Sequence, residues 1–261
     1  MEQITSYQNP RIKNLLLLQE KSRERRKQNL IVVEGFREFN IALNSGYSPV
    51  EVFYCQEVAE IDLSIIPPAT RITYISRTVF EKIAYREGSD GFIALFQPGL
   101  LTLDEIKLSR DPLVIILESV EKPGNLGAIL RTADAVDADA VIVCDPLTDI
   151  HNPNVIRSSV GCVFSRQVAA CTTAEAQAWL TKNHITSYAA ELTASSRYDG
   201  HNYRKATAFV MGTEADGLTG TWINFCDHRI IIPMLGSIDS LNVSVSTAVL
   251  LFEAKRQRDF V

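Results

Sequence analysis

Five polar residues in the second half of the chain have the types and spacing that a reaction at a bound ligand would need. They are Asn125, Arg131, Glu214, Ser240 and Asn242. Each follows a predominantly apolar run that predicts a strand. Because the carboxyl ends of parallel strands meet at one edge of a sheet, we expect the three loops that carry these residues to line one crevice. Taken singly, each residue also has an ordinary structural explanation as a helix cap, a surface charge or part of a glycine turn.

The last of these loops joins an apolar run at 228–232 to a predicted helix that begins near residue 243 and continues past Glu253. Pro233 ends the strand, and Gly236 is free to take a positive φ. Free backbone N–H and C=O groups at the end of a strand, facing a helix N-terminus, suit a nucleotide-like ligand. A plain strand–loop–helix corner is the alternative.

The first loop, at 118–127, contains Gly124 and Gly127 and resembles a phosphate-binding turn. It matches neither G-x-G-x-x-G nor G-x-x-x-x-G-K-[ST]. A nicotinamide or ATP site is therefore disfavoured, and with it a nucleotide-dependent small-molecule enzyme on a Rossmann-type sheet.

The composition is that of a globular protein, with 46% hydrophobic and 22% charged residues and a net charge of −5. No global positive field indicates a nucleic-acid partner. The five cysteines are widely spread without a C-x-x-C pair, and the four histidines are isolated, so we expect reduced thiols and no metal site. The N-terminus lacks an apolar signal core and no apolar run is long enough for a bilayer, so we expect a cytoplasmic protein without a membrane partner.

The order of strand-like and helix-like segments predicts an α/β protein of two domains. Residues 1–97 alternate strands and helices, beginning with a helix from Pro10 to about Lys27. Residues 98–112 are polar, contain Pro and Gly, and are expected to form a linker. Residues 113–261 alternate buried strands with helices, one of them near 154–163, which predicts a parallel sheet covered on both faces.

The first predicted helix is strongly basic. Between Arg11 and Lys27 there are seven positive and two negative residues, a local net charge of +5, which leaves the remainder of the chain near −10. A solvated helix face is one explanation, and a docking surface for RNA phosphates is the other. The candidate RNA-binding residues are Arg11, Lys13, Arg23, Arg25, Arg26 and Lys27.

The polar loops together resemble the motifs of a known family. The three segments are Asn125-x-Gly127-x-x-x-Arg131-Thr132, Gly212-x-Glu214-x-x-Gly217-Leu218 and Pro233-Met234-x-Gly236-x-x-x-Ser240-Leu241-Asn242-Val243-Ser244. In this order they resemble the SpoU (TrmH-like) RNA ribose 2′-O-methyltransferases of the SPOUT superfamily. The resemblance implies a parallel-sheet α/β domain with a C-terminal trefoil knot, S-adenosylmethionine as cofactor, and a homodimer with each active site near the interface.

The resemblance also assigns roles to individual residues. Asn125, Arg131, Glu214, Ser240 and Asn242 match the family's polar active-site positions. The positions expected to hold the cofactor are Gly212, Ile232, Met234, Gly236 and Leu241. The first domain resembles the small RNA-binding α/β module of many family members through Asn9-Pro10-Arg11-Ile12-Lys13 and Val33-Glu34-Gly35, although relatives often have Ser-Pro-x-Gly where this chain has Ser89-Asp90-Gly91.

The added first domain favours large-subunit ribosomal RNA over transfer RNA as the substrate. A transfer-RNA methyltransferase, a non-catalytic RNA-binding protein on the same fold and an antibiotic-resistance methyltransferase stay open as alternatives.

Methyl transfer to a ribose hydroxyl requires that the hydroxyl lose a proton. The pKa of a guanidinium lies far above neutral pH, so we expect Arg131 to hold the developing alkoxide or an adjacent phosphate through two N–H groups rather than to act as the base. The proton would pass to a phosphate, a water or Glu214. Asn125 and Asn242 would orient the ribose and the loops, and Ser240 would brace them.

Overall fold

The computed structural model describes residues 3–85 and 90–260. The chain folds into two compact units. The first unit holds the chain up to Gly99 together with His151–Ser165, and the second holds Leu100–Ile150 and Arg166–Val261. The segment 151–165 thus belongs to the N-terminal unit, although it follows the predicted linker by almost forty residues. No helix within the described residues is both long and apolar enough to cross a membrane.

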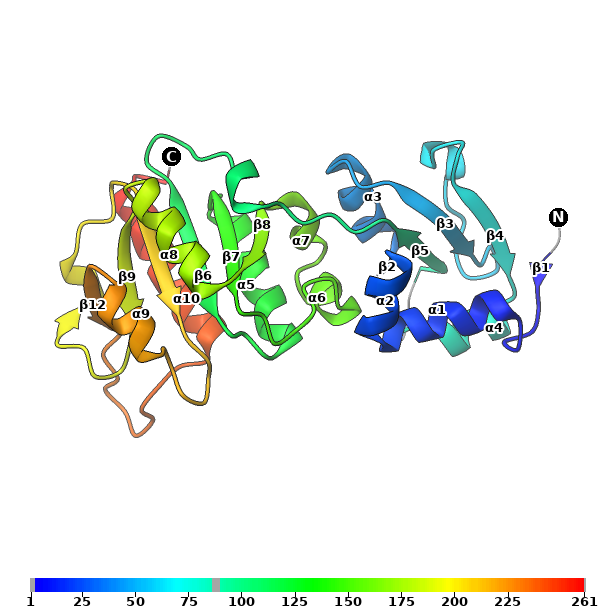
Figure 1. The fold of residues 1–261 in the computed structure, drawn as a ribbon. Helices are drawn as coiled ribbons and strands as arrows, with labels where there is room; N and C mark the ends of the chain where they lie inside the picture. Colours follow the sequence, from blue (N-terminus) through cyan, green and yellow to red (C-terminus); the bar gives the residue numbers. More distant parts are fainter. Residues whose placement is uncertain (1–2, 86–89, 261) are drawn as a thin grey trace. The chain divides into compact units, whose positions relative to one another are not determined.

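The first unit is built on a five-stranded mixed sheet of order β1-β4-β3-β5-β2 (Figure 1). β5 runs antiparallel to β2 and to β3, whereas β4 is parallel to β1 and β3. The strands are β1 (Gln3–Ile4), β2 (Ile31–Glu34), β3 (Pro49–Tyr54), β4 (Arg71–Ile75) and β5 (Phe92–Phe96).

Six helices belong to this unit in the described chain. They are α1 (Pro10–Glu20), α2 (Ser22–Gln28), α3 (Phe36–Asn44), α4 (Arg77–Ile83), α6 (Pro153–Ser158) and α7 (Cys162–Ser165), with a short 3₁₀ turn at Leu63–Ile65. Asn9 caps α1, and Ile12, Leu15 and Leu18 on one side of that helix are fully buried in the core. Their spacing is the helical one that buries a single apolar stripe.

The long basic helix predicted for 10–27 is two helices in the structure. The chain leaves the helical conformation at Lys21, where φ is −109° and ψ is 106°. The Arg25 guanidinium donates to the carbonyls of Leu18 (2.6 Å) and Gln19 (3.0 Å), which have lost their helical partners at this break. The prediction of one continuous helix is therefore wrong at Lys21.

The second unit is a seven-stranded sheet of order β10-β12-β9-β11-β6-β7-β8, and every pair of neighbours is parallel. The strands are β6 (Leu113–Glu118), β7 (Ala140–Cys144), β8 (Val168–Cys171), β9 (Thr186–Ala190), β10 (Ser196–Arg197), β11 (Thr207–Met211) and β12 (His228–Ile231). All six residues of β6 and all five of β7 are buried, as expected for strands covered on both faces. The predicted parallel sheet is confirmed.

Helices cover both faces of this sheet (Figure 1). They are α5 (Pro123–Ala135), α8 (Thr173–Lys182), α9 (Gly220–Phe225) and α10 (Val243–Gln257), with 3₁₀ turns at Leu103–Glu105 and Tyr198–Gly200. Val114 and Ile116 of β6 pack in one cluster with Trp179 of α8 and Trp222 of α9. The helices α5 and α10 pack against each other on the other face.

Three local details differ from the sequence expectation. The helix expected near 154–163 is divided into α6 and α7, because Val160 and Gly161 both take positive φ, 55° and 83°. The strand β10 and the helix α9 were not anticipated. The glycine turn expected at 86–91 lies mostly outside the described residues.

Candidate functional site

A pocket of about 390 Å³ lies at the carboxyl edge of the parallel sheet. Its walls come from the residues that follow β9, β11 and β12 and from the start of α10. This edge is where parallel α/β sheets bind ligands, and the volume lies within the usual range of small-molecule sites. The prediction that the loop after β11 and the loop before α10 converge here agrees with the geometry.

Four of the five predicted cofactor residues line this pocket. They are Gly212, Ile232, Met234 and Leu241. Gly236 does not line it, because this glycine lies on an exposed part of the loop between β12 and α10 with no atom within 4 Å of the position of an added Cβ. Binding of the cofactor by these five residues stays a prediction.

Gly212 is needed for a reason that the sequence did not reveal. A Cβ at this position would lie 2.1 Å from the carbonyl carbon of Gly217 and 2.4 Å from the amide nitrogen of Leu218. The loop folds back on itself here, since Thr213 and Gly217 exchange two backbone hydrogen bonds of 3.0 and 3.2 Å. The clash of an added side chain would therefore be with the backbone of the protein itself.

The carboxylate of Glu214 is the point at which the three predicted loops meet. Its Oε1 accepts a hydrogen bond of 2.6 Å from the Asn125 amide and a second one from the Asn242 amide. Its Oε2 accepts from the ammonium group of Lys122 in an ion pair. The amides are also joined directly, because Asn242 Nδ2 donates to Asn125 Oδ1 at 3.2 Å.

These donors fix the charge of Glu214. The hydrogen bond from Lys122, followed by that from Asn125, lowers the pKa of the Glu214 carboxyl below its ordinary value. The group is therefore ionised at neutral pH. A carboxylate with a lowered pKa that already accepts three hydrogen bonds is a weak proton acceptor, which bears on its chemical role.

Asn242 is oriented by the helix that it begins. Its Oδ1 accepts from the Ser244 backbone N–H at 2.9 Å and from the Ser244 hydroxyl at 2.6 Å, which caps α10. With the oxygen used in the cap, the Nδ2 group is the part that faces Glu214 and Asn125. The same side chain thus starts the helix and holds the site.

The two remaining candidate residues are placed differently. Ser240 lines the pocket, and its hydroxyl lies 3.4 Å from Oδ1 of Asp239. Arg131 is exposed on α5 and does not line the pocket. Within residues 3–85 and 90–260 it makes no side-chain hydrogen bond or ion pair, so its guanidinium is available to a ligand or a partner.

The sequence reasoning missed several charged residues at this edge, and two of them form ion pairs. Lys122, directly before α5, is the cation that pairs with Glu214. Glu191, the first residue after β9, lines the pocket and forms an ion pair with Arg229. The strand-end rule that found the other loops would have found Glu191 as well. In the part of the chain that the structure describes, no group of three or more His, Cys, Asp or Glu residues is placed to hold a metal ion.

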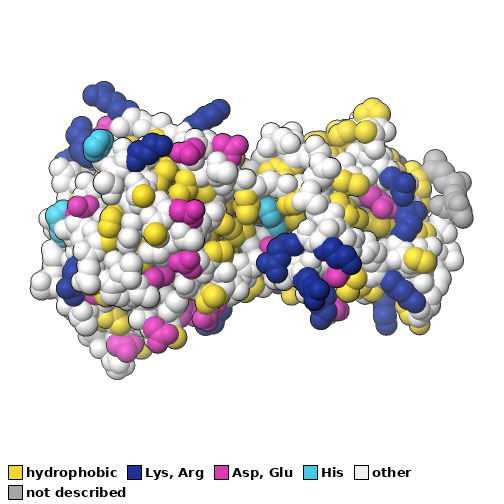
Figure 2. Space-filling view, viewed as in Figure 1, with side chains coloured by type: hydrophobic (Ala, Val, Ile, Leu, Met, Phe, Trp, Pro, Cys, Tyr) yellow, Lys and Arg dark blue, Asp and Glu magenta, His cyan; other side chains and the backbone are white. Residues whose placement is uncertain are grey.

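Four of the six predicted RNA-binding residues are exposed in the first unit. They are Lys13, Arg23, Arg26 and Lys27. Figure 2 shows Lys and Arg side chains gathered on the face of this unit that carries α2. Arg25 is only 3% exposed and binds the two carbonyls at the α1–α2 break, so its guanidinium is not presented to solvent. Arg11 is half-buried and pairs with Glu51.

Comparison with known proteins gives the same picture for both parts of the chain. Residues 112–252 match the model of the SpoU rRNA Methylase family, and residues 9–94 match the MRM3-like substrate binding domain. The 23S rRNA (guanosine-2′-O-)-methyltransferase RlmB of Haemophilus influenzae is 36% identical over 72% of this chain and 79% of its own length. The 23S rRNA (guanosine(2553)-2′-O)-methyltransferase RlmP of Bacillus subtilis is 26% identical over 98% of this chain and 100% of its own length.

Solved structures resemble the whole chain. A crystal structure of an RNA 2′-O ribose methyltransferase is 37% identical, with a TM-score of 0.86 over 98% of this chain and 99% of its own. An rRNA methyltransferase from Sinorhizobium meliloti, solved with AdoMet bound, is 26% identical, with a TM-score of 0.89 over 98% and 97%. The parallel sheet, the loops that meet at Glu214 and the match over more than half of the sequence lead to one conclusion: the chain belongs to the SpoU rRNA methylase family.

Proposed function

We propose that this protein transfers a methyl group from S-adenosylmethionine to a ribose 2′-hydroxyl of large-subunit ribosomal RNA. The observation that carries the proposal is the meeting of Asn125, Glu214 and Asn242 beside the pocket at the carboxyl edge of the sheet. The relatives RlmB and RlmP, both 23S rRNA 2′-O-methyltransferases, supply the reaction and the class of RNA.

The charge of the pocket suits this cofactor better than a nucleotide polyphosphate. Among the described residues that line the pocket there is no Lys or Arg, whereas Glu191, Glu214 and Asp216 carry carboxylates. Lys122 and Arg229 balance two of these from outside the lining. Pyrophosphate would have no cation to bind here, while the positive sulfonium and ammonium groups of S-adenosylmethionine are compatible with the carboxylates.

The pocket also offers apolar walls for an adenine ring. Leu218, Ile232, Met234 and Leu241 line it, and backbone groups of the loop after β11 lie beside them. When bound, S-adenosylmethionine supplies an activated methyl group. The tasks left to the protein are to position the ribose, to stabilise developing charge and to exclude water.

In this proposal Glu214 organises the site and does not accept the proton. The carboxylate holds the amides of Asn125 and Asn242 in fixed positions. The Asn242 amide is fully used in these contacts and in the cap of α10, so one N–H and one lone pair of Asn125 are left to orient the ribose. The guanidinium of Arg131 binds the developing alkoxide or a neighbouring phosphate. Ser240 braces the loop, and the hydroxyl proton passes to a phosphate or a water.

We further propose a homodimer in which the partner's surface completes the site near Arg131. Support comes from α10, where Val245 and Phe252 are 47% and 46% exposed and lie seven residues apart, on one side of the helix. The resemblance to the SPOUT superfamily also leads us to propose a C-terminal trefoil knot and a cytoplasmic location. We propose in addition that the RNA-binding domain, the linker and the methyltransferase domain have the boundaries 1–97, 98–112 and 113–261. The match of the MRM3-like substrate binding domain to residues 9–94 supports RNA binding by the first domain.

Two experiments test the proposal. Ribose methylations are mapped in total RNA from cells with and without the gene, and loss of one methylation in 23S ribosomal RNA is expected. Loss of a methylation in transfer RNA instead would identify transfer RNA as the substrate, and no change would favour a non-catalytic RNA-binding protein.

The second experiment is a thermal-shift assay, in which S-adenosylmethionine should raise the Tm of the protein while NAD and ATP should not.

A further inference from the structure

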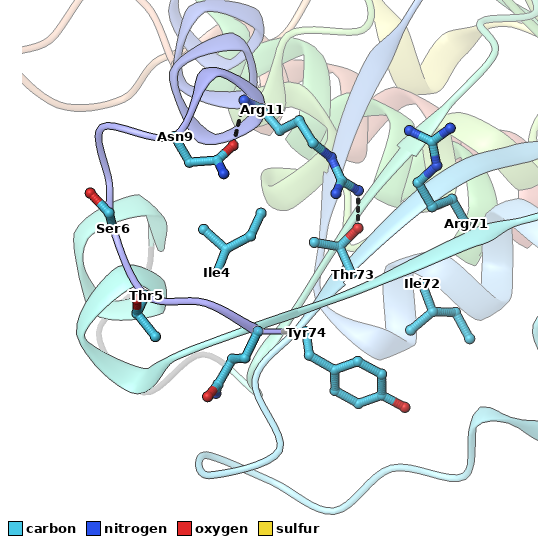
Figure 3. A pocket seen from close by; sticks show the side chains of 10 residues that line it. Ile4, Thr5, Ser6, Asn9, Arg11, Arg71, Ile72, Thr73 and Tyr74 are labelled. Atoms are coloured by element: carbon cyan, nitrogen blue, oxygen red, sulfur yellow. Dashed lines mark hydrogen bonds between the residues drawn. The ribbon is translucent and has the colours of Figure 1, made fainter. Parts of the chain in front are cut away.

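The first unit contains a pocket of its own, of about 620 Å³ (Figure 3). It is formed by β1, the turn at 5–9, the start of α1 and the first residues of β4. The residues that line it carry hydroxyl, amide and guanidinium groups beside an apolar wall. Such a mixture fits a ligand that has both a phosphate and a ring.

The positive charge of this pocket resides in Arg11 and Arg71. The carboxylate of Glu51 is already taken, because it accepts from Arg11 and, at 2.8 Å, from the Thr73 hydroxyl. Arg71 is exposed, and within residues 3–85 and 90–260 its guanidinium has no hydrogen-bond or ion-pair partner. After Arg11 is balanced by Glu51, Arg71 leaves the pocket with one uncompensated positive charge.

Other groups that can bind a phosphate oxygen line the end of the pocket away from Arg71. The hydroxyls of Thr5 and Ser6 line the pocket, as does Asn9, which caps α1. The N-terminus of this 11-residue helix contributes a positive partial charge to the same space. Figure 3 shows Arg11, Arg71 and Thr73 on one side of β4.

An apolar wall lies on the other side of the same strand. Because side chains alternate along a strand, Ile72 and Tyr74 face away from Arg71 and Thr73, and Figure 3 shows them so. Ile72 is 36% exposed and Tyr74 is half-buried, which leaves room for a flat ring against them. The pocket therefore reaches around the edge of β4, with charge on one side and an aromatic ring on the other.

We infer that this pocket binds one unpaired nucleotide of the RNA substrate, with the phosphate on Arg71 and the base against Tyr74 and Ile72. The inference rests on the proposed function in so far as RNA is the substrate. A base can reach a side-chain wall only when it is unstacked, so the pocket selects a single-stranded loop or bulge and not a continuous duplex. The site would position the RNA while the chemistry takes place in the second unit.

The test measures RNA binding by the full chain without S-adenosylmethionine. Fluorescence anisotropy follows a short labelled oligouridylate and, separately, a labelled blunt-ended RNA duplex without unpaired nucleotides. Arg71→Ala should weaken binding of the oligouridylate about tenfold, as expected for loss of one charge-assisted phosphate contact. The slope of log Kd against log salt should fall by about 0.7 for the lost contact to a single strand. Tyr74→Leu should weaken the same binding about fivefold or more through loss of stacking.

Arg37→Ala is the matched control. Arg37 is exposed on α3, which follows the strand at the opposite edge of the same sheet, and its side chain makes no hydrogen bond or ion pair in the described chain. It should leave the affinity for the oligouridylate within about twofold. An effect of Arg37→Ala equal to that of Arg71→Ala would overturn the inference, because nonspecific charge would then explain both.

Two further outcomes would overturn it. Equal losses for the duplex and the oligouridylate would exclude selection of an unpaired nucleotide, and an unchanged affinity in Tyr74→Leu would exclude a base at that wall. Failure of the proposed function gives a different result. The unmodified protein would then neither bind S-adenosylmethionine nor methylate ribosomal RNA, independently of the effect of Arg71→Ala on RNA binding. If the unmodified protein methylates RNA and Arg71→Ala binds the oligouridylate as tightly, only the present inference fails.

Discussion

Replacement of Glu214 by Gln separates a residue that organises the site from one that accepts the proton. Gln keeps an oxygen that can accept from Asn125 and Asn242, but loses the charge that pairs with Lys122. The Lys122 side chain is 67% exposed and that of Glu214 is 25% exposed, so solvent screens the pair. We estimate its loss at about 0.5–1.5 kcal/mol, which corresponds to roughly a two- to tenfold fall in kcat/KM.

A general base gives a much larger effect. Its removal typically lowers the rate by about 10² to 10⁴. The pH dependence differs as well. The pKa of Glu214 in the folded protein is lower than its ordinary value of 4.5. The ionised carboxylate therefore stabilises the folded protein at every pH above the pKa of the unfolded chain. This stabilisation is lost only as the pH falls through the lower pKa of the folded protein. At neutral and alkaline pH the group should not titrate.

The assay is transfer of labelled methyl groups to ribosomal RNA from about pH 6 to about pH 9, well above the range in which a carboxyl with a lowered pKa titrates. Glu121→Gln is the control, because Glu121 is an exposed neighbour with no side-chain partner in the described residues. We expect Glu214→Gln to retain at least a tenth of the activity with an unchanged pH profile. A loss above a hundredfold across the whole pH range would refute the organising role and make Glu214 the base.

Three further predictions concern other parts of the chain. Gly212→Ala should reduce the free energy of unfolding by about 1–3 kcal/mol in urea denaturation, because its Cβ would meet the backbone of Gly217; equal stability would show that the turn relaxes. Arg25→Ala should lower the free energy of unfolding by about 1.5–3 kcal/mol, whereas Arg26→Ala should weaken RNA binding without changing that free energy. A stable Arg25→Ala protein together with a destabilised Arg26→Ala protein in thermal melts would contradict the placement of these arginines. Arg131→Lys should lower kcat at least about tenfold at neutral pH, and near-full activity would exclude contact through two N–H groups.

The sheet and the position of the site were accessible from the sequence because strong, simple forces determine them. The apolar side chains from Leu113 to Leu117 are all removed from water only if helices cover both faces of the sheet. Parallel strands in turn place the loops that follow them at one edge of the sheet. Asn125, Glu214 and Asn242 therefore met as the topology requires, although 89 and 117 residues separate the first of them from the other two.

Other features depend on individual side-chain geometries that no pattern encodes. At the helix break at Lys21, the Arg25 guanidinium donates hydrogen bonds to two backbone carbonyls. The basic composition of this segment does not distinguish such a buried arginine from one that faces solvent. Gly212 is constrained by a fold-back of its own loop, which is visible only once Gly217 is in place. Gly236 matched a motif in sequence, yet it is not among the residues that line the pocket.

The site owes its geometry to two helix N-termini that meet at one carboxylate. Lys122 and Asn125 come from the start of α5, Asn242 caps α10, and these two helices pack against each other along the sheet. A negative charge near the N-terminus of a helix is favourable, so Glu214 is stabilised by both helix ends as well as by its three donors. Because α5 also carries Arg131, any shift of α5 against α10 moves the proposed transition-state contact relative to the pocket. In the proposed mechanism the packing of this helix pair would therefore be part of the catalytic arrangement, and a partner chain seated on α10 would act on the same geometry.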